Sequence, residues 1–158
     1  MIKVAILIPT MNRSEFLIRQ LKYYSSLSSP HPVYIGDASD KEHSERTKHA
    51  SEKLNDQITI HYYHWPGHND RQTMKRLGDV AMESYCAYNG DDDFLIPNSL
   101  SKCAEFLERN PDYRTAQGKA VIFELKETGH FGTVSSVGKY RSNNKAEEDT
   151  GSERILNF

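Results

Sequence analysis

The chain has 158 residues and a mass of 18.1 kDa, a length typical of one domain. Lysine and arginine number 20 and aspartate and glutamate 22, so the formal net charge is −2. This excludes a globally basic nucleic-acid-binding protein, and we expect no nucleic-acid partner. The longest aliphatic run, Val4 to Ile8, is too short to cross a bilayer or to form the apolar part of a signal peptide. We therefore expect no transmembrane segment and a cytoplasmic location, with peripheral contact with a membrane left open.

Strand-like and helix-like patterns alternate along most of the chain. Runs rich in β-branched and aromatic residues predict five strands, at 2–8, 33–35, 58–65, 85–89 and 115–125. Amphipathic or highly charged segments predict four helices between them: one from Ser14, one over 41–56, one from Asn69 and one around 100–107. Cys86 and Cys103 fall in one of these strands and one of these helices, and we expect both to be buried and reduced.

This alternation favours an α/β fold, with a mostly parallel sheet and helices on both of its faces. Residues 1–125 are expected to form this domain. Residues 126–158 are expected to be a polar loop or tail, because 126–151 are rich in glycine, serine, threonine, asparagine and charge. The last residues, 153–158, regain some apolar character.

Polar side chains follow each of the first four predicted strands. These side chains belong to Pro9-Thr10, Asp37, the segment 66–71 and the triplet Asp91 to Asp93. In open parallel sheets, ligands bind beyond the carboxyl ends of the strands. We therefore expect these four loops to converge on one edge of the sheet, although they lie far apart in the sequence.

The triplet Asp91, Asp92 and Asp93 is the most informative of these segments. Three adjacent carboxylates repel one another, and a divalent cation offsets that repulsion. Mg²⁺ and Mn²⁺ prefer oxygen ligands, and Mg²⁺ is commonly held between one or two carboxylates and substrate phosphates. The alternative interpretation is an acidic turn that caps the following helix.

The helix from Asn69 is predicted to begin with a variant of the capping box, in which Gln72 is the second partner. Its free N–H groups suit an anion, and Lys75 and Arg76, one turn in, could contact a diphosphate. The alternative is that both basic residues lie on a solvated helix face.

Asp37 and the pair Pro9-Thr10 each have two interpretations. Asp37 could accept hydrogen bonds from a base or a ribose, or it could form an Asx turn. Pro9 and Thr10 could line a base pocket, or they could simply end a strand. The residues alone do not decide between these alternatives.

Four segments together resemble the GT-A glycosyltransferases, in particular the family 2-like group. In chain order they are VAILIPTMNR, VYIGDASD, GHNDRQTMKRLGDVA and YCAYNGDDDFLIPNSL. The resemblance extends over roughly residues 2–125. It implies a Rossmann-like GT-A fold, a nucleotide-diphospho-sugar donor, Mg²⁺ or Mn²⁺, and transfer that inverts the anomeric centre. The acceptor, the base and the sugar are not implied.

The resemblance also implies roles for individual residues. Thr10 and Asp37, with Pro9 beside them, match the base and ribose contacts, and Lys75, with Arg76 beside it, matches a basic position near the diphosphate. The triplet matches the D-x-D region. Read literally, that motif is Asp91-x-Asp93. If the family motif is instead aligned through Pro97, the implied metal ligand is Asp92, next to Asp93. In that alignment Asp91 lies nearer the ribose.

Two features depart from that family. Gly90 stands where the family motif usually has its first aspartate, and the family's catalytic base lies in a later part of the chain. Residues Glu147 to Asp149 are interpreted as a solvated charge run, so the catalytic residue stays unassigned.

The sequence thus favours a metal-dependent glycosyltransferase, and it leaves open that the chain is the donor-binding piece of a longer enzyme. The alternatives are a non-catalytic nucleotide-sugar-binding module and, less favoured, a sugar-phosphate nucleotidyltransferase. The second alternative is disfavoured because the loop PTMNR after the first strand has no glycine.

Overall fold

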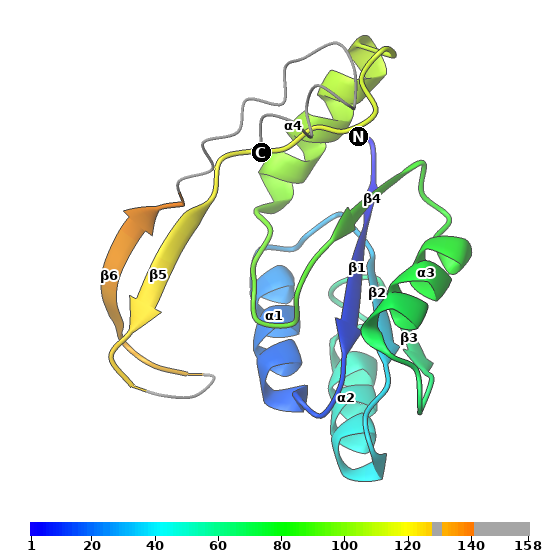
Figure 1. Cartoon of the computed structure of the whole chain (residues 1–158), viewed down its shortest axis with the longest axis vertical. Helices are drawn as coiled ribbons and strands as arrows, with labels where there is room; N and C mark the ends of the chain where they lie inside the picture. Colours follow the sequence, from blue (N-terminus) through cyan, green and yellow to red (C-terminus); the bar gives the residue numbers. More distant parts are fainter. Residues whose placement is uncertain (128–130, 141–158) are drawn as a thin grey trace. The chain divides into compact units, whose positions relative to one another are not determined.

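The structure is a computed structural model of the chain, and it describes residues 1–127 and 131–140 (Figure 1). The chain divides into two compact units, 1–118 and 119–158, each of which is described here by itself. The sequence-based boundary lies near residue 125. Glu147 to Asp149 and residues 153–158, for which the sequence suggested a charge run and an apolar ending, lie outside the described residues.

The first unit is built on a four-stranded parallel sheet. Its strands are β1 (Val4–Thr10), β2 (Val33–Asp37), β3 (Ile60–His64) and β4 (Tyr85–Tyr88), in the spatial order β3-β2-β1-β4. All three pairings are parallel. The predicted α/β class with a mostly parallel sheet is therefore confirmed. β1 lies between β2 and β4, which is why its sequence is apolar on both faces.

Helices cover both faces of this sheet. α1 (Ser14–Ser26) and α2 (Lys41–Leu54) lie on one side, and α3 (Asp70–Val80) lies on the other (Figure 1). α4 (Pro97–Arg109) contributes Leu100 to the core on the α1 side. Successive β1 side chains alternate between the two cores: Ile6 and Ile8 pack with α1, whereas Ala5 and Leu7 pack with α3.

The start of α3 confirms the predicted capping box. The Asn69 side-chain oxygen accepts a hydrogen bond from the Gln72 backbone N–H at 2.9 Å, and the Gln72 side-chain oxygen accepts one from the Asn69 N–H at 3.0 Å. Two otherwise unpaired backbone donors are satisfied in this way. The capping box therefore determines where α3 begins, at the edge of the sheet where the candidate site lies.

The fifth predicted strand does not extend the parallel sheet. The predicted strand over 115–125 is present as the shorter β5 (Val121–Leu125), but it pairs antiparallel with β6 (Val134–Lys139) in a separate two-stranded sheet. The prediction of a loop throughout 126–151 is wrong at β6. Every residue of β6, VSSVGK, is exposed in the structure. The strand therefore buries no face, and its sequence lacks the alternation of apolar and polar residues that identifies a half-buried strand.

The prediction that both cysteines are buried is also wrong. Cys86 is exposed and Cys103 is partly exposed. Cys86 lies on β4, which has a neighbour on one side only, and exposure alternates along that strand. Among the described residues, no helix combines the length and the apolar character needed to cross a membrane.

His31, which is fully buried between α1 and β2, joins the sheet to α4. Its Nδ1 accepts a hydrogen bond from the Val4 N–H at 3.1 Å, so the other ring nitrogen carries the proton. That nitrogen lies 3.0 Å from the Pro97 carbonyl oxygen and 3.1 Å from the Ser101 hydroxyl. Burial lowers the pKa of His31, against the opposing effect of the Pro97 carbonyl. The native state therefore holds this imidazole neutral.

We expect the free energy of unfolding to decrease as the pH falls below about 6.5, in part because of His31. The pKa is lower in the folded state, so the unfolded chain binds the proton more readily and is favoured by acid. Urea denaturation of wild type and His31→Asn at several values between pH 7.5 and 5 measures this effect. The variant keeps an acceptor for Val4 and is expected to show a shallower pH dependence.

The exposed His49, changed to asparagine, is the control and is expected to behave like wild type. Equal slopes for wild type and His31→Asn would contradict the expectation.

Candidate functional site

A cleft of about 430 Å³ opens at the carboxyl ends of β1 and β4. The chain proceeds from β1 to β2 and β3 on one side and then places β4 on the other side of β1. Ligands of open α/β sheets bind at such a change of direction. The cleft is lined by the end of β1, the start of α1, the start of α3 and the loop after β4. The lining residues are Pro9, Thr10, Met11, Arg13, Ala38, His68, Asn69, Asp70, Thr73, Gly90, Asp91 and Asp92.

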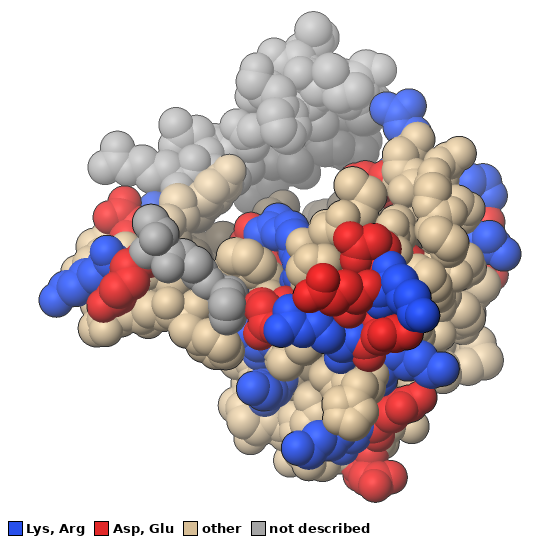
Figure 2. All heavy atoms as spheres, turned by 90° about the horizontal axis from the view of Figure 1, so that it is seen from below, with Lys and Arg blue, Asp and Glu red and all other residues tan. Residues whose placement is uncertain are grey.

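Viewed toward the carboxyl ends of the strands, acidic and basic side chains are interspersed and do not form a patch of one sign (Figure 2). In the cleft, Arg13 forms ion pairs with Asp91 and Asp92. The pairs within the cleft determine what it can bind.

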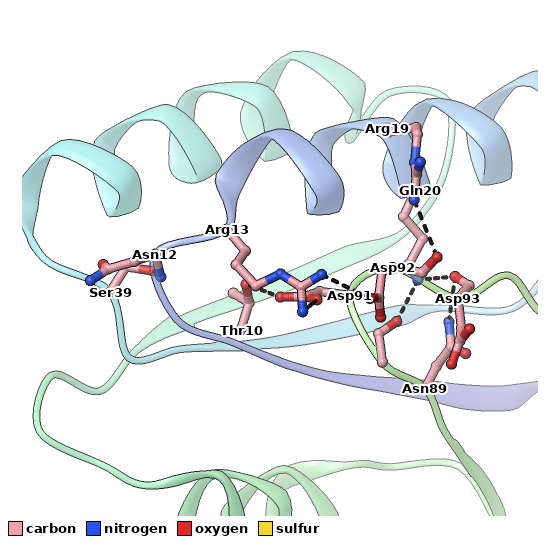
Figure 3. Close-up of polar contacts among 11 residues, drawn as sticks. Thr10, Asn12, Arg13, Arg19, Gln20, Ser39, Asn89, Asp91, Asp92 and Asp93 are labelled. Carbon is pink, nitrogen blue, oxygen red and sulfur yellow. Dashed lines mark hydrogen bonds and ion pairs between the residues drawn. The ribbon is translucent and has the colours of Figure 1, made fainter. Parts of the chain in front are cut away.

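Asp91 is the buried carboxylate of the cleft, and its side chain is only 7% exposed. The Thr10 hydroxyl donates a hydrogen bond to one oxygen at 2.8 Å, and an Arg13 guanidinium nitrogen lies 3.1 Å from the other (Figure 3). Burial raises the pKa of Asp91, whereas Thr10 and Arg13 oppose that change. These two neighbours therefore offset part of the cost of placing a carboxylate out of water, and burial remains the larger effect.

Asp92 differs from Asp91 in exposure and in the direction of its pKa shift. Its side chain is 50% exposed, and its Oδ2 accepts a hydrogen bond from Arg13 Nη2 at 2.8 Å. This hydrogen bond from Arg13 lowers the pKa of Asp92. Asp92 is therefore a charged carboxylate that water and small ligands can reach.

Helix α1 holds the acidic loop in place through polar side chains on its buried face. The Gln20 side-chain amide donates to the carbonyl oxygens of Gly90, at 2.7 Å, and of Asp93. The Tyr24 hydroxyl accepts hydrogen bonds from the Asn89 side chain and the Leu95 N–H, both at 3.2 Å. The sequence analysis assigned no role to Gln20. Its signal was a polar residue three positions after Leu17, within an apolar helical stripe.

Asp93 does not line the cleft, but its carboxylate shares a space with that of Asp92. A Cβ atom added to Gly90 would lie 3.2 Å from Asp92 Oδ1 and 3.4 Å from Asp93 Oδ2. One oxygen of each carboxylate therefore lies close to Gly90. Within residues 1–127 and 131–140, no three histidine, cysteine, aspartate or glutamate side chains form a group that could hold a metal ion. Two carboxylates alone would need further oxygen ligands from water or substrate.

Asp37 lies next to the cleft but does not line it. Its side chain is fully buried, and both carboxylate oxygens already have partners. One accepts from the Ser39 N–H at 2.8 Å, and the other accepts from the Tyr62 hydroxyl at 3.0 Å. The first bond is the one expected of an Asx turn. In this structure Asp37 therefore supports the loop after β2.

Lys75 and Arg76 also lie away from the cleft lining. The Lys75 ammonium pairs with Asp79 one turn later, at 2.6 Å, and the Lys75 side chain is 76% exposed. The Arg76 guanidinium lies over the Trp65 ring, 4.6 Å from its centroid. Of the residues that the sequence suggested for the donor and the metal, the cleft lining contains Pro9, Thr10, Asp91 and Asp92, and it lacks Asp37, Lys75, Arg76 and Asp93.

Two buried polar atoms in the cleft wall lack hydrogen-bond partners in the described structure. They are Thr73 Oγ1, on a residue that is 1% exposed, and His68 Nδ1. Buried polar atoms are nearly always paired, with protein, water or ligand. Both residues line the cleft, but neither of these two atoms is accessible to solvent there. His68 belongs to the segment 66–71 that the sequence predicts at this edge of the sheet, whereas Thr73 was not selected from the sequence.

Two crystal structures of S. aureus TarS match the chain. One shares 17% sequence identity, has a TM-score of 0.54 and covers 68% of this chain and 20% of that chain. The other, of TarS 1-349, shares 16% identity, has a TM-score of 0.57 and covers 76% of this chain and 34% of that chain. At such identities the likeness shows the fold alone, a glycosyltransferase-like α/β fold. This chain spans a fifth to a third of those chains.

No protein-family model matches the sequence, and no curated protein matches it. The assignment to the family 2-like group therefore stays a prediction.

Proposed function

We propose that the cleft binds a nucleotide-diphospho-sugar and that the chain is a metal-dependent glycosyltransferase or its donor-binding part. The observation that carries this proposal is the position of Asp91 and Asp92 at the carboxyl ends of β1 and β4. There they meet Thr10 in a cleft large enough for part of a nucleotide. The fold-level likeness to TarS supports it.

In this proposal Asp92 and Asp93 hold Mg²⁺ or Mn²⁺ beside Gly90, and phosphate oxygens of the donor complete the ligand set. When bound, the cation offsets the negative charge that builds on the leaving diphosphate. Asp91, kept in place by Thr10, accepts hydrogen bonds from the ribose, and Pro9 and Thr10 border the base.

The other residues that the resemblance implied need rearrangement to take part. Lys75 and Arg76 would leave Asp79 and Trp65 to reach a diphosphate, and Asp37 would exchange a present partner for the donor. The acceptor hydroxyl attacks the anomeric carbon with inversion, and a carboxylate removes its proton. We assign no residue to that base.

Isothermal titration calorimetry with UDP, GDP and their sugars, with and without Mn²⁺, tests the proposal. We expect one nucleotide to bind wild type in the presence of Mn²⁺, and Asp92→Asn to lose at least about tenfold in affinity, since a ligand of the cation is weakened. The matched control is Asp79→Asn, which removes an exposed carboxylate on α3 outside the cleft. It is expected to bind like wild type.

Each alternative outcome has a clear meaning. If a folded wild-type protein binds none of these nucleotides, the proposed function is wrong. If it binds the donor but releases no nucleoside diphosphate with any acceptor, the non-catalytic nucleotide-sugar-binding module is the better description. Binding that is unaffected by Asp92→Asn would place the cation elsewhere.

A further inference from the structure

The guanidinium of Arg13 lies across the acidic end of the cleft. One of its nitrogens is 3.1 Å from Asp91 Oδ1, and another is 2.8 Å from Asp92 Oδ2 (Figure 3). Its central carbon lies 4.5 Å from the centroid of the Phe16 ring, one turn into α1. Arg13 directly precedes α1, and its side chain is 42% exposed. The positively charged guanidinium of Arg13 therefore contacts Asp92, the carboxylate at which we propose that a metal ion binds.

The charges of the cleft give Arg13 a second possible partner. Three aspartates line the cleft, and in the described part of the chain Arg13 is its only lining lysine or arginine. A diphosphate is an anion, so three carboxylates without a cation would repel it. Lys75 and Arg76 are engaged with Asp79 and Trp65. Arg13 is therefore the basic side chain of the cleft lining that could contact a diphosphate.

We propose that Arg13 is a donor-binding residue with two successive partners: it pairs with Asp91 and Asp92 in the empty cleft, and it turns to the donor's diphosphate when a divalent cation binds Asp92. This inference rests on the proposed function. A guanidinium suits both partners, because its fork of N–H donors matches carboxylate and phosphate alike.

The two aspartates tolerate the departure of the guanidinium for different reasons. Asp91 keeps the hydrogen bond from the Thr10 hydroxyl, so its buried carboxylate is not left without a partner. Asp92 is half exposed, so water or the incoming cation replaces the lost contact. The exchange therefore leaves neither carboxylate without a hydrogen-bond partner.

The test measures two affinities that are expected to change in opposite directions. Mn²⁺ alone is titrated first, and UDP is then titrated at saturating Mn²⁺. We expect Arg13→Gln to bind Mn²⁺ about tenfold more tightly than wild type, because no guanidinium competes for Asp92. We expect the same variant to bind UDP about tenfold more weakly, because the diphosphate loses its basic partner.

Two further variants make the result specific. Arg46→Gln removes the same charge from an exposed pair with Glu15, at 3.2 Å on the protein surface, and is expected to match wild type in both titrations. Arg13→Lys keeps the charge but reaches one carboxylate at a time, so both of its affinities are expected to lie between those of wild type and Arg13→Gln. It also serves as the test variant if thermal unfolding shows that Arg13→Gln is not folded.

The outcomes separate this inference from the proposed function. If wild type binds both Mn²⁺ and UDP but Arg13→Gln does not tighten Mn²⁺ binding, or does not weaken UDP binding, the two-partner role of Arg13 is wrong and the proposed function stands. If wild type binds neither Mn²⁺ nor any of UDP, GDP and their sugars, both proposals are overturned.

Discussion

Gly36→Ala is expected to lower the free energy of unfolding by about 1–3 kcal/mol, the usual cost of overfilling a packed core. Gly36 lies on β2, where every residue is buried, and α3 packs directly on it. A Cβ atom at this position would lie 2.4 Å from Thr73 Cγ2 and 3.2 Å from Leu77 Cδ1. Because the first distance is shorter than real non-bonded carbon–carbon contacts, either the Thr73 side chain or α3 must shift in the variant.

The matched control is the same substitution at Gly78, on the exposed side of α3. A Cβ atom there would meet only the Tyr88 hydroxyl, at 3.8 Å. Alanine favours a helix over glycine, so Gly78→Ala is expected to raise the free energy of unfolding by about 0.5–1 kcal/mol. Urea denaturation of both variants measures the two effects. Equal stabilities of Gly36→Ala and wild type would show that α3 does not approach β2 as closely as described.

Tyr24→Phe is expected to lower the free energy of unfolding by about 1–3 kcal/mol, because the Asn89 amide and the Leu95 N–H lose their shared acceptor. Tyr24 is fully buried, and burial raises the pKa of its phenol. These hydrogen bonds connect α1 to both ends of the acidic loop. The variant is therefore also expected to weaken Mn²⁺ binding, although Tyr24 does not line the cleft.

Tyr23→Phe is the control for this prediction. In the part of the chain that the structure describes, the Tyr23 hydroxyl has no hydrogen bond, while its ring packs against Tyr24 and Phe94. Removal of this hydroxyl is expected to change stability by no more than about 0.5 kcal/mol. Denaturant unfolding and Mn²⁺ titration of both variants provide the comparison. If the two variants are indistinguishable, the Tyr24 hydroxyl does not anchor the loop.

The elements of the parallel sheet could be read from the sequence because each one carries a strong local signal. β1 is apolar on both faces, as a central parallel strand must be. α3 begins at a capping box formed by Asn69 and Gln72. β5 also has a local strand signal, but a strand pattern does not identify its partner. Its pairing with β6 depends on a segment whose side chains are all exposed.

The candidate site was predictable in part. Thr10 and the aspartate triplet each follow a strand, and the parallel topology brings Thr10, Asp91 and Asp92 to one cleft. The roles of Asp37 and Lys75 could not be decided in this way. Each has a competing local partner, Ser39 for Asp37 and Asp79 for Lys75. A pattern of residue types does not show which partner a side chain takes.

The sequence by itself determined the α/β class, the alternation of strands and helices, and the edge of the sheet at which polar residues gather. These properties follow from local periodicity and from the rule that parallel strands end on the same side. Only the tertiary structure decided that β4 lies beside β1, that Arg13 bridges Asp91 and Asp92, and that Gln20 and Tyr24 hold the acidic loop. These contacts join residues about 70 to 80 positions apart in the chain, and long-range contacts of that kind leave no periodic trace in a single sequence.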